Sequence, residues 1–127
     1  MEKYQVRDIA LAPSGHRKIQ WVRDNMPLLR GLEEEYTKTR PFEGIKISLS
    51  VHLEAKTAYL CMVLAAGGAD MSVTGSNVLS TQDDVAAALA DSGMKVFAYH
   101  GATQEEYDRH IEMCLSHKPN IIIDDGA

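Results

Sequence analysis

Segments typical of β-strands alternate with segments typical of helices along most of this chain, and the connections between them are short. Strands are predicted at 45–51, 69–73, 95–99 and 120–124, and helices at 55–66, from 83 to just before Gly93, and at 103–116. Strand-helix-strand units with such short connections require parallel strands and right-handed crossovers. The sequence therefore predicts an α/β fold, a three-layer open parallel sheet of the Rossmann or flavodoxin type with four recognisable strands.

Two helices are predicted before the first strand. Ser14 fits as the cap of a helix from about Gly15 to Asn25, and Pro27 fits the first turn of a second helix that ends near Thr39. Further along, Thr103 and Glu106 fit a capping box at the start of the last helix. The chain contains no linker, repeat or low-complexity segment, so residues 1–127 are predicted to form a single domain.

Composition and charge exclude several classes of partner. The net charge is −5 without any basic cluster, which argues against nucleic-acid and anionic-membrane surfaces. No apolar run approaches the roughly 20 residues that cross a bilayer, and the N-terminus lacks the apolar core of a signal peptide. We therefore expect a cytoplasmic protein. Cys61 and Cys114 lie in apolar helical stretches without metal-ligand spacing, and both are predicted to be buried small hydrophobes.

Ionisable and polar residues follow three of the predicted strands. His52 ends the first strand, the stretch 77–84 follows the second, and Asp124 and Asp125 end the last. In open α/β sheets, ligands bind in the crevice outside the carboxyl ends of the strands. The motifs G-x-G-x-x-G, Walker A, H-E-x-x-H and G-x-S-x-G are missing, and the remaining histidines have no partners at ligand spacing, so no metal site is expected.

Each of these polar residues also has a purely structural explanation. A lone histidine such as His52 is more often a hydrogen-bonded structural residue than a catalyst. The polar residues after the second strand could do no more than cap the next helix, and Lys56 could simply extend from a helix surface. Asp124 and Asp125 are adjacent in a strand and point to opposite faces, so at most one of them can enter the crevice directly.

Five blocks of the chain resemble, in order and spacing, the N-terminal part of the S-adenosylhomocysteine hydrolase family. These blocks are Asp8–Ala12, Asn25–Leu29, Ser50–Ala58, Asn77–Ala88 and Ile123–Gly126. The most specific is Asn-x-x-Ser-Thr-Gln-Asp, which is followed by an alanine-rich helix. The resemblance spans essentially all 127 residues but covers only the first part of the family's sequence.

The resemblance implies an enzyme that reversibly hydrolyses S-adenosyl-L-homocysteine to adenosine and homocysteine in the methyl cycle. Members of the family use bound NAD to oxidise the ribose 3′ hydroxyl transiently. In them the NAD-binding domain lies after the segment present here, so no cofactor-binding residue is expected in this chain. The resemblance also implies a homotetramer, a small nucleoside thioether as the substrate, and no activity for these 127 residues alone.

The resemblance assigns roles to individual residues. His52 would carry protons near the leaving sulfur and the attacking water, and Asp125 would be an acid/base carboxylate close to the ribose. The substrate-binding residues would be Glu54, Lys56, Thr57, Asn77, Ser80, Thr81 and Gln82.

The purine-reading positions differ from those of many family members, which carry threonine and glutamate where this chain has Glu54 and Lys56. A carboxylate accepts from the 6-amino group of adenine, whereas an ammonium donates to the 6-oxo group of hypoxanthine. Adenosine is the expected nucleoside, with S-inosylhomocysteine as an alternative substrate. A second alternative is a stand-alone ligand-binding or oligomerisation module without catalysis.

Overall fold

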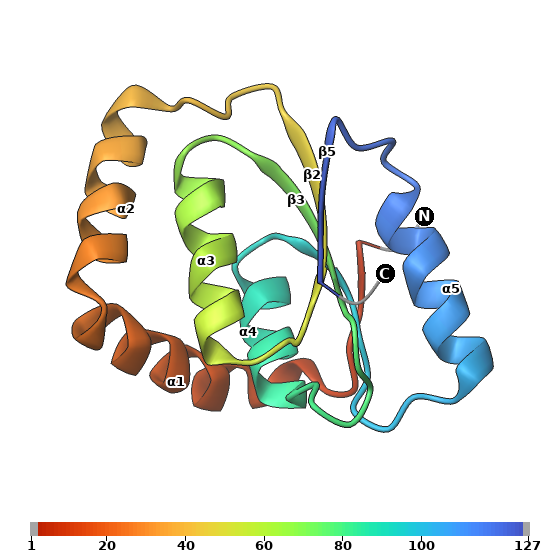
Figure 1. Ribbon diagram of the computed structural model, residues 1–127. Helices are drawn as coiled ribbons and strands as arrows, with labels where there is room; N and C mark the ends of the chain where they lie inside the picture. Colours follow the sequence, from red (N-terminus) through yellow and green to blue (C-terminus); the bar gives the residue numbers. More distant parts are fainter. Residues whose placement is uncertain (1–2, 126–127) are drawn as a thin grey trace.

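The computed structural model describes residues 3–125. These residues form a single twisted sheet with helices on both faces (Figure 1). The helices are η1 (Ile9–Leu11), α1 (Ala12–Asn25), α2 (Pro27–Thr39), α3 (Ala55–Ala66), α4 (Asp83–Asp91) and α5 (Gln104–Leu115). The strands are β1 (Tyr4–Gln5), β2 (Lys46–Val51), β3 (Asp70–Gly75), β4 (Lys95–Phe97) and β5 (Ile121–Asp124). Gly126, part of the last of the five sequence blocks, lies outside the described residues.

The sheet is entirely parallel, in the order β1-β4-β3-β2-β5. Helices α1 to α4 lie on one side of it and α5 lies on the other (Figure 1). The predicted fold class is thus confirmed, and the structure adds one strand. β1 has only two residues, which pair with Val96 and Phe97 of β4. Two residues are too few to show a hydrophobic alternation, so the sequence pattern could not reveal this strand.

The start of α1 differs from the prediction. The helix begins at Ala12, with Pro13 in its first turn, and Leu11 stands at the cap position without a side-chain hydrogen bond. Ser14 is therefore inside the helix, and its hydroxyl donates to Asp84 Oδ2 of α4 at 2.7 Å. Local capping rules place this serine at the helix end. In the structure its hydroxyl forms a tertiary hydrogen bond instead, so the predicted cap at Ser14 is wrong. At α5 the capping box between Thr103 and Glu106 is confirmed.

The two faces of β2 bury different chemistry. Ile47 and Leu49 belong to the main hydrophobic core, whereas Ser48 lies on the opposite face and is only 2% exposed. The Ser48 hydroxyl donates to the Cys114 carbonyl oxygen of α5 at 2.8 Å. A serine can therefore be buried beneath a packed helix, because a backbone carbonyl at the end of that helix accepts a hydrogen bond from its hydroxyl.

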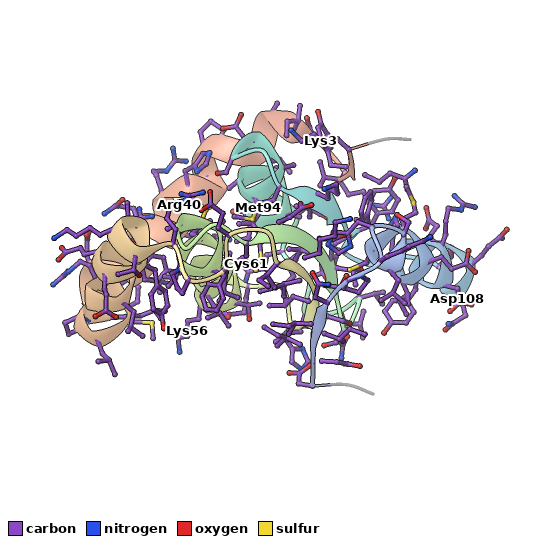
Figure 2. All side chains as sticks on the ribbon, turned by 90° about the horizontal axis from the view of Figure 1, so that it is seen from above. Lys3, Arg40, Lys56, Cys61, Met94 and Asp108 are labelled. Carbon is purple, nitrogen blue, oxygen red and sulfur yellow. The ribbon has the colours of Figure 1, made fainter. Side chains whose placement is uncertain are left out.

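Both cysteines are buried and free, as predicted. Cys61 lies in the middle of the molecule in Figure 2, whereas Lys56 and Asp108 lie on its periphery. Burial, with a smaller contribution from Cys114, raises the pKa of the Cys61 thiol to about 12. A thiol with this pKa stays protonated at neutral pH and is unreactive. Within residues 3–125, every helix falls short of the length and apolarity that spanning a bilayer requires.

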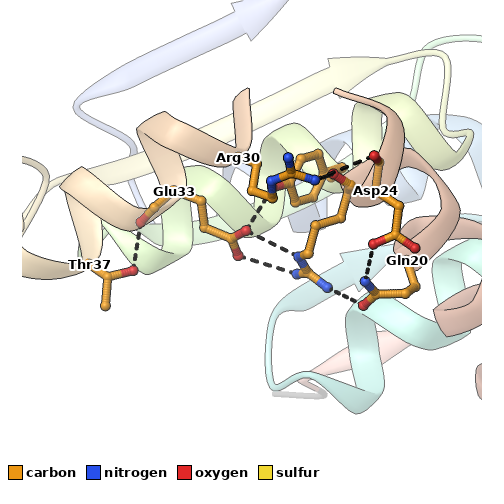
Figure 3. Close-up of polar contacts among 7 residues, drawn as sticks. Gln20, Asp24, Arg30, Glu33 and Thr37 are labelled. Carbon is orange, nitrogen blue, oxygen red and sulfur yellow. Dashed lines mark hydrogen bonds and ion pairs between the residues drawn. The ribbon is translucent and has the colours of Figure 1, made fainter. Parts of the chain in front are cut away.

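A network of polar side chains fastens α1, α2 and α3 together. Glu33 of α2 accepts two hydrogen bonds from the Arg23 guanidinium, at 3.1 and 3.2 Å. It also accepts one from the Tyr59 hydroxyl of α3 at 2.6 Å. Figure 3 shows Glu33 facing the side chains of α1, where Arg23 also donates to Gln20 at 2.8 Å. These contacts hold the three helices in register on one face of the sheet.

Candidate active site

The residues predicted to form the site gather at the carboxyl ends of β2, β3 and β5. The registers pair Val51 with Gly75 and Ser50 with Asp124, so the three strands end at nearly the same level. His52 follows β2 directly, and Asp125 follows β5. The backbone N–H of Gln82, at the start of α4, donates to the Leu53 carbonyl at 3.0 Å and ties the loops after β2 and β3 together. Parallel strands thereby bring together segments that are distant in the sequence.

His52 is exposed, and its side chain contacts Ser80. The distance from His52 Nδ1 to Ser80 Oγ is 2.7 Å. The Ser80 hydroxyl in turn lies 3.1 Å from the Asn77 carbonyl oxygen, to which it donates. The structure thus joins two residues that the sequence predicted separately, and Nδ1 is the ring nitrogen that makes the contact.

The loop between β3 and α4 is shaped by its own hydrogen bonds. Asn77 Oδ1 accepts from the Leu79 backbone N–H at 2.8 Å. Thr81 is 4% exposed, and its hydroxyl donates to the Asn77 carbonyl at 3.0 Å. The Asn77 and Thr81 side chains are therefore engaged inside the loop, where they fix the position of Ser80.

Glu54 caps α3 and thereby uses part of its hydrogen-bonding capacity. Its Oε1 accepts from the Thr57 backbone N–H at 2.8 Å and from the Thr57 hydroxyl at 3.3 Å. Thr57 is 9% exposed, so its hydroxyl is directed to Glu54. Lys56, in the first turn of the same helix, is exposed, and among residues 3–125 no hydrogen bond or ion pair is found for its ammonium group. Lys56 is therefore available to a ligand, and Glu54 retains its second oxygen.

An open groove of about 760 Å³ lies between the start of α4 and α1, and His52, Lys56 and Asp125 are not among the residues that line it. Glu54, Ser80 and Gln82 are among its lining residues, and α1 contributes Lys18. Lys18 Nζ lies 3.1 Å from Gln82 Oε1 and 2.9 Å from Asp84 Oδ2. The sequence analysis missed Lys18, because nothing in the local pattern of α1 indicates that this lysine reaches the loop after β3.

The charge of Asp84 is stabilised at this wall of the groove. Partial burial by itself would raise the pKa of Asp84, but hydrogen bonds from Lys18 and Ser14 outweigh burial. The net result is a lowered pKa, so Asp84 is an anion at neutral pH. The lysine and the carboxylate form a partly exposed pair that fixes one end of the Gln82 side chain.

Asp124 and Asp125 lie in different surroundings. Asp124 lines a second cavity, of about 360 Å³, between the sheet and α5. Asp125 is exposed beyond the end of β5, and its backbone N–H lies 3.4 Å from the Ser50 carbonyl oxygen. Asp125 and His52 thus flank the same end of β2, and among residues 3–125 no hydrogen bond or ion pair joins them.

The starts of α3 and α4, the helices nearest to His52 and Ser80, do not suit a dinucleotide, and residues 3–125 contain no metal cluster. Residues 3–125 contain no group of three or more histidine, cysteine, aspartate or glutamate side chains that could hold a metal ion. A pyrophosphate prefers a helix N-terminus with free N–H groups and positive potential. Here the Glu54 carboxylate occupies the start of α3, and Asp83 and Asp84 lie in the first turn of α4. NAD therefore does not fit at either helix.

Comparison with known proteins gives a consistent result. The family described as S-adenosyl-L-homocysteine hydrolase matches residues 3–127. The S-inosyl-L-homocysteine hydrolase of Methanocaldococcus jannaschii is 53% identical over 124 residues, which are 98% of this chain and 30% of that protein. The S-inosyl-L-homocysteine hydrolase of Methanopyrus kandleri is 51% identical with the same coverage, and so is the adenosylhomocysteinase of Thermococcus kodakarensis.

The chain spans about 30% of the length of these curated relatives. The matched range includes the loops that carry His52 and Ser80. On this evidence the chain belongs to the S-adenosyl-L-homocysteine hydrolase family.

Proposed function

We propose that this chain forms the proton-transferring and purine-reading part of an enzyme that hydrolyses the thioether of a nucleosyl-homocysteine. The observation that carries the proposal is the exposed His52, held by Ser80 at the carboxyl end of the sheet beside the groove. Membership of the family supplies the type of reaction. The requirement for NAD, the place in the methyl cycle, the cytoplasmic location and the tetramer belong to the proposal for the whole protein.

The reaction needs groups that carry protons. Homocysteine leaves as a thiolate, which must gain a proton, and the water that replaces it must lose one. An imidazole exchanges protons near neutral pH and can serve both steps. His52 is exposed and contacts Ser80, which lines the groove, and Asp125 is exposed just after the neighbouring strand β5. The starts of α3 and α4 do not suit NAD, and the steps assigned here are those of this chain's own side chains.

We further propose that the preferred substrate is S-inosyl-L-homocysteine, the alternative in the sequence analysis, in place of the adenosyl substrate expected there. Glu54 Oε1 is engaged at the start of α3, which leaves one carboxylate oxygen, whereas Lys56 is exposed. An exposed ammonium donates to the 6-oxo group of hypoxanthine but cannot accept from the 6-amino group of adenine. Relatives with both names are about equally similar to this chain, so identity alone does not choose between the two substrates.

Release of homocysteine thiol tests the reaction. The longest natural form of the protein that contains this chain is assayed with NAD, using S-inosyl- and S-adenosyl-homocysteine. We expect thiol release that falls by roughly 10²-fold or more in His52→Ala. The matched control is His16→Ala, which should leave the rate unchanged, because His16 is a partly exposed histidine on α1 that pairs with Asp91. No release from either substrate would refute the enzyme proposal and favour a binding module.

An exchange of the two purine-reading residues tests the substrate. The double variant Glu54→Thr, Lys56→Glu restores the residues common in the family and should shift the preference from the inosyl to the adenosyl substrate, by roughly tenfold to hundredfold in kcat/KM. Lys46→Met is the control, because Lys46 is exposed at the opposite end of β2. An unchanged preference in the double variant would refute the role of Lys56.

A further inference from the structure

Three groups form a continuous hydrogen-bonded chain that starts at His52. Nδ1 of the imidazole contacts Ser80 Oγ at 2.7 Å, and Ser80 Oγ donates to the Asn77 carbonyl oxygen at 3.1 Å. A serine hydroxyl has one proton to donate and two lone pairs that accept. A carbonyl oxygen only accepts. When the Ser80 proton points to Asn77, Ser80 Oγ can only accept from His52, so Nδ1 must carry a proton.

This arrangement suits a group that gains and loses a proton repeatedly. When the imidazole is charged, both nitrogens are protonated and Nδ1–H must find an acceptor. Ser80 Oγ provides it while its own O–H continues to donate to the Asn77 carbonyl. When the imidazole is neutral with Nδ1–H retained, every one of these bonds remains. The opposite arrangement, in which Ser80 donates to Nδ1, would force the hydroxyl to rotate at each proton transfer.

The acceptor at the end of this chain is fixed in space. The Asn77 carbonyl also receives the Thr81 hydroxyl at 3.0 Å and the backbone N–H groups of Ser80 and Thr81, each at 3.2 Å. Thr81 itself is buried. The loop therefore presents Ser80 to His52 from a rigid support, which is what holding one ring orientation requires.

We propose that Ser80 is a positioning residue that holds His52 with Nδ1 protonated, so that Nε2 is the only ring atom that exchanges protons with the substrate. The proposal deepens the proposed function and rests on it for the role of His52. It assigns the Ser80 hydroxyl to the histidine rather than to the substrate.

Nitrogen NMR of the ring tests the tautomer without any reaction. The 127-residue chain is labelled with ¹⁵N-histidine and observed at a pH where the imidazole is neutral, and the His52 signals are identified by their loss in His52→Gln. We expect protonated Nδ1 and unprotonated Nε2 in the wild type. The same state should persist in Ser80→Thr, which keeps the hydroxyl. In Ser80→Ala a major population should carry the proton on Nε2 instead.

The control substitution is Ser92→Ala, whose hydroxyl bonds within α4 and not to a histidine; it should leave the His52 signals unchanged. Wild-type protein with the proton on Nε2 would overturn the proposal, even if Ser80→Ala failed to fold. An unchanged tautomer in folded Ser80→Ala would overturn it as well.

A kinetic measurement separates this proposal from the proposed function. In the longest natural form, Ser80→Ala should lower kcat for thiol release roughly tenfold with little change in KM, and Ser80→Thr should restore most of it. An unchanged kcat, or a loss confined to KM, would overturn the positioning role while the hydrolase assignment stands. Absence of thiol release in the wild type would refute the function and leave the tautomer result valid.

Discussion

Replacement of Glu33 by glutamine should destabilise the protein more than its place on a surface helix suggests. The carboxylate accepts two hydrogen bonds from Arg23 and one from Tyr59. Glutamine keeps the shape but offers one acceptor oxygen and turns an amide N–H₂ toward donors. Tyr59 is fully buried, and the side chains of Arg23 and Glu33 are 26% and 22% exposed. Solvent therefore screens the network only in part.

The expected loss follows from these contacts. One charged hydrogen bond is worth about 1.5–3 kcal/mol, and those that remain weaken by about 0.5–1 kcal/mol when the charge is removed. Partial exposure reduces the sum, so the free energy of unfolding should fall by about 2–3 kcal/mol. For a domain of this size the midpoint of thermal unfolding should drop by roughly 10 °C.

Urea unfolding of the wild type, Glu33→Gln and Glu34→Gln measures this loss. Glu34 is the exposed neighbour on the same helix, and its substitution should change stability by less than about 0.5 kcal/mol. Equal stability of the two variants would refute the reasoning. Tyr59→Phe alone and combined with Glu33→Gln completes a double-mutant cycle, in which the two losses should not add.

The pH dependence gives an independent check. Burial alone would raise the pKa of Glu33, but hydrogen bonds from Arg23 and Tyr59 outweigh it and lower this pKa below its ordinary value of 4.5. A lowered pKa in the folded state stabilises the fold above the unfolded value, and this contribution is lost as pH falls. The stability difference between wild type and Glu33→Gln should therefore be constant above about pH 6 and shrink below pH 4.5.

Three further predictions concern packing, alkaline pH and the edge of the sheet. Gly15→Ala should lower the free energy of unfolding by about 2 kcal/mol or more, because a Cβ there meets the Asp84 carbonyl of α4. Gly31→Ala, with open space around the added Cβ, should raise it by about 0.5–1 kcal/mol. Urea unfolding that gives both changes the same sign would contradict this. Burial and the Glu33 carboxylate raise the pKa of Tyr59 to about 12, so the free energy of unfolding should fall by roughly 2 kcal/mol between pH 10 and 12. Urea unfolding at a series of pH values measures this fall, and Tyr59→Phe should remove it. Ile122 is 60% exposed on the edge strand β5 and should promote self-association of the 127-residue chain. Ile122→Lys should reduce this self-association in sedimentation experiments. Equal self-association of the wild type and the variant would refute the role of the β5 edge.

The sequence by itself determined the elements whose causes are local. The alternation of Ile47 with Ser48 marks a strand, and the capping box at Thr103 marks the start of α5. Because parallel connections constrain the topology, the same patterns also placed His52 and Asp125 at the carboxyl ends of neighbouring strands. Local hydrogen bonds and hydrophobic periodicity act over a few residues, so inspection of the chain reveals them.

Only the tertiary structure decided which polar groups meet. Ser14 bonds to Asp84 instead of capping its own helix, and Lys18 crosses from α1 to Gln82. The contact between His52 and Ser80 joins residues 28 positions apart. Each of these pairings depends on how helices and loops pack against the common sheet. The short range of side-chain hydrogen bonds makes such pairings depend on the assembled fold, and no local pattern encodes them.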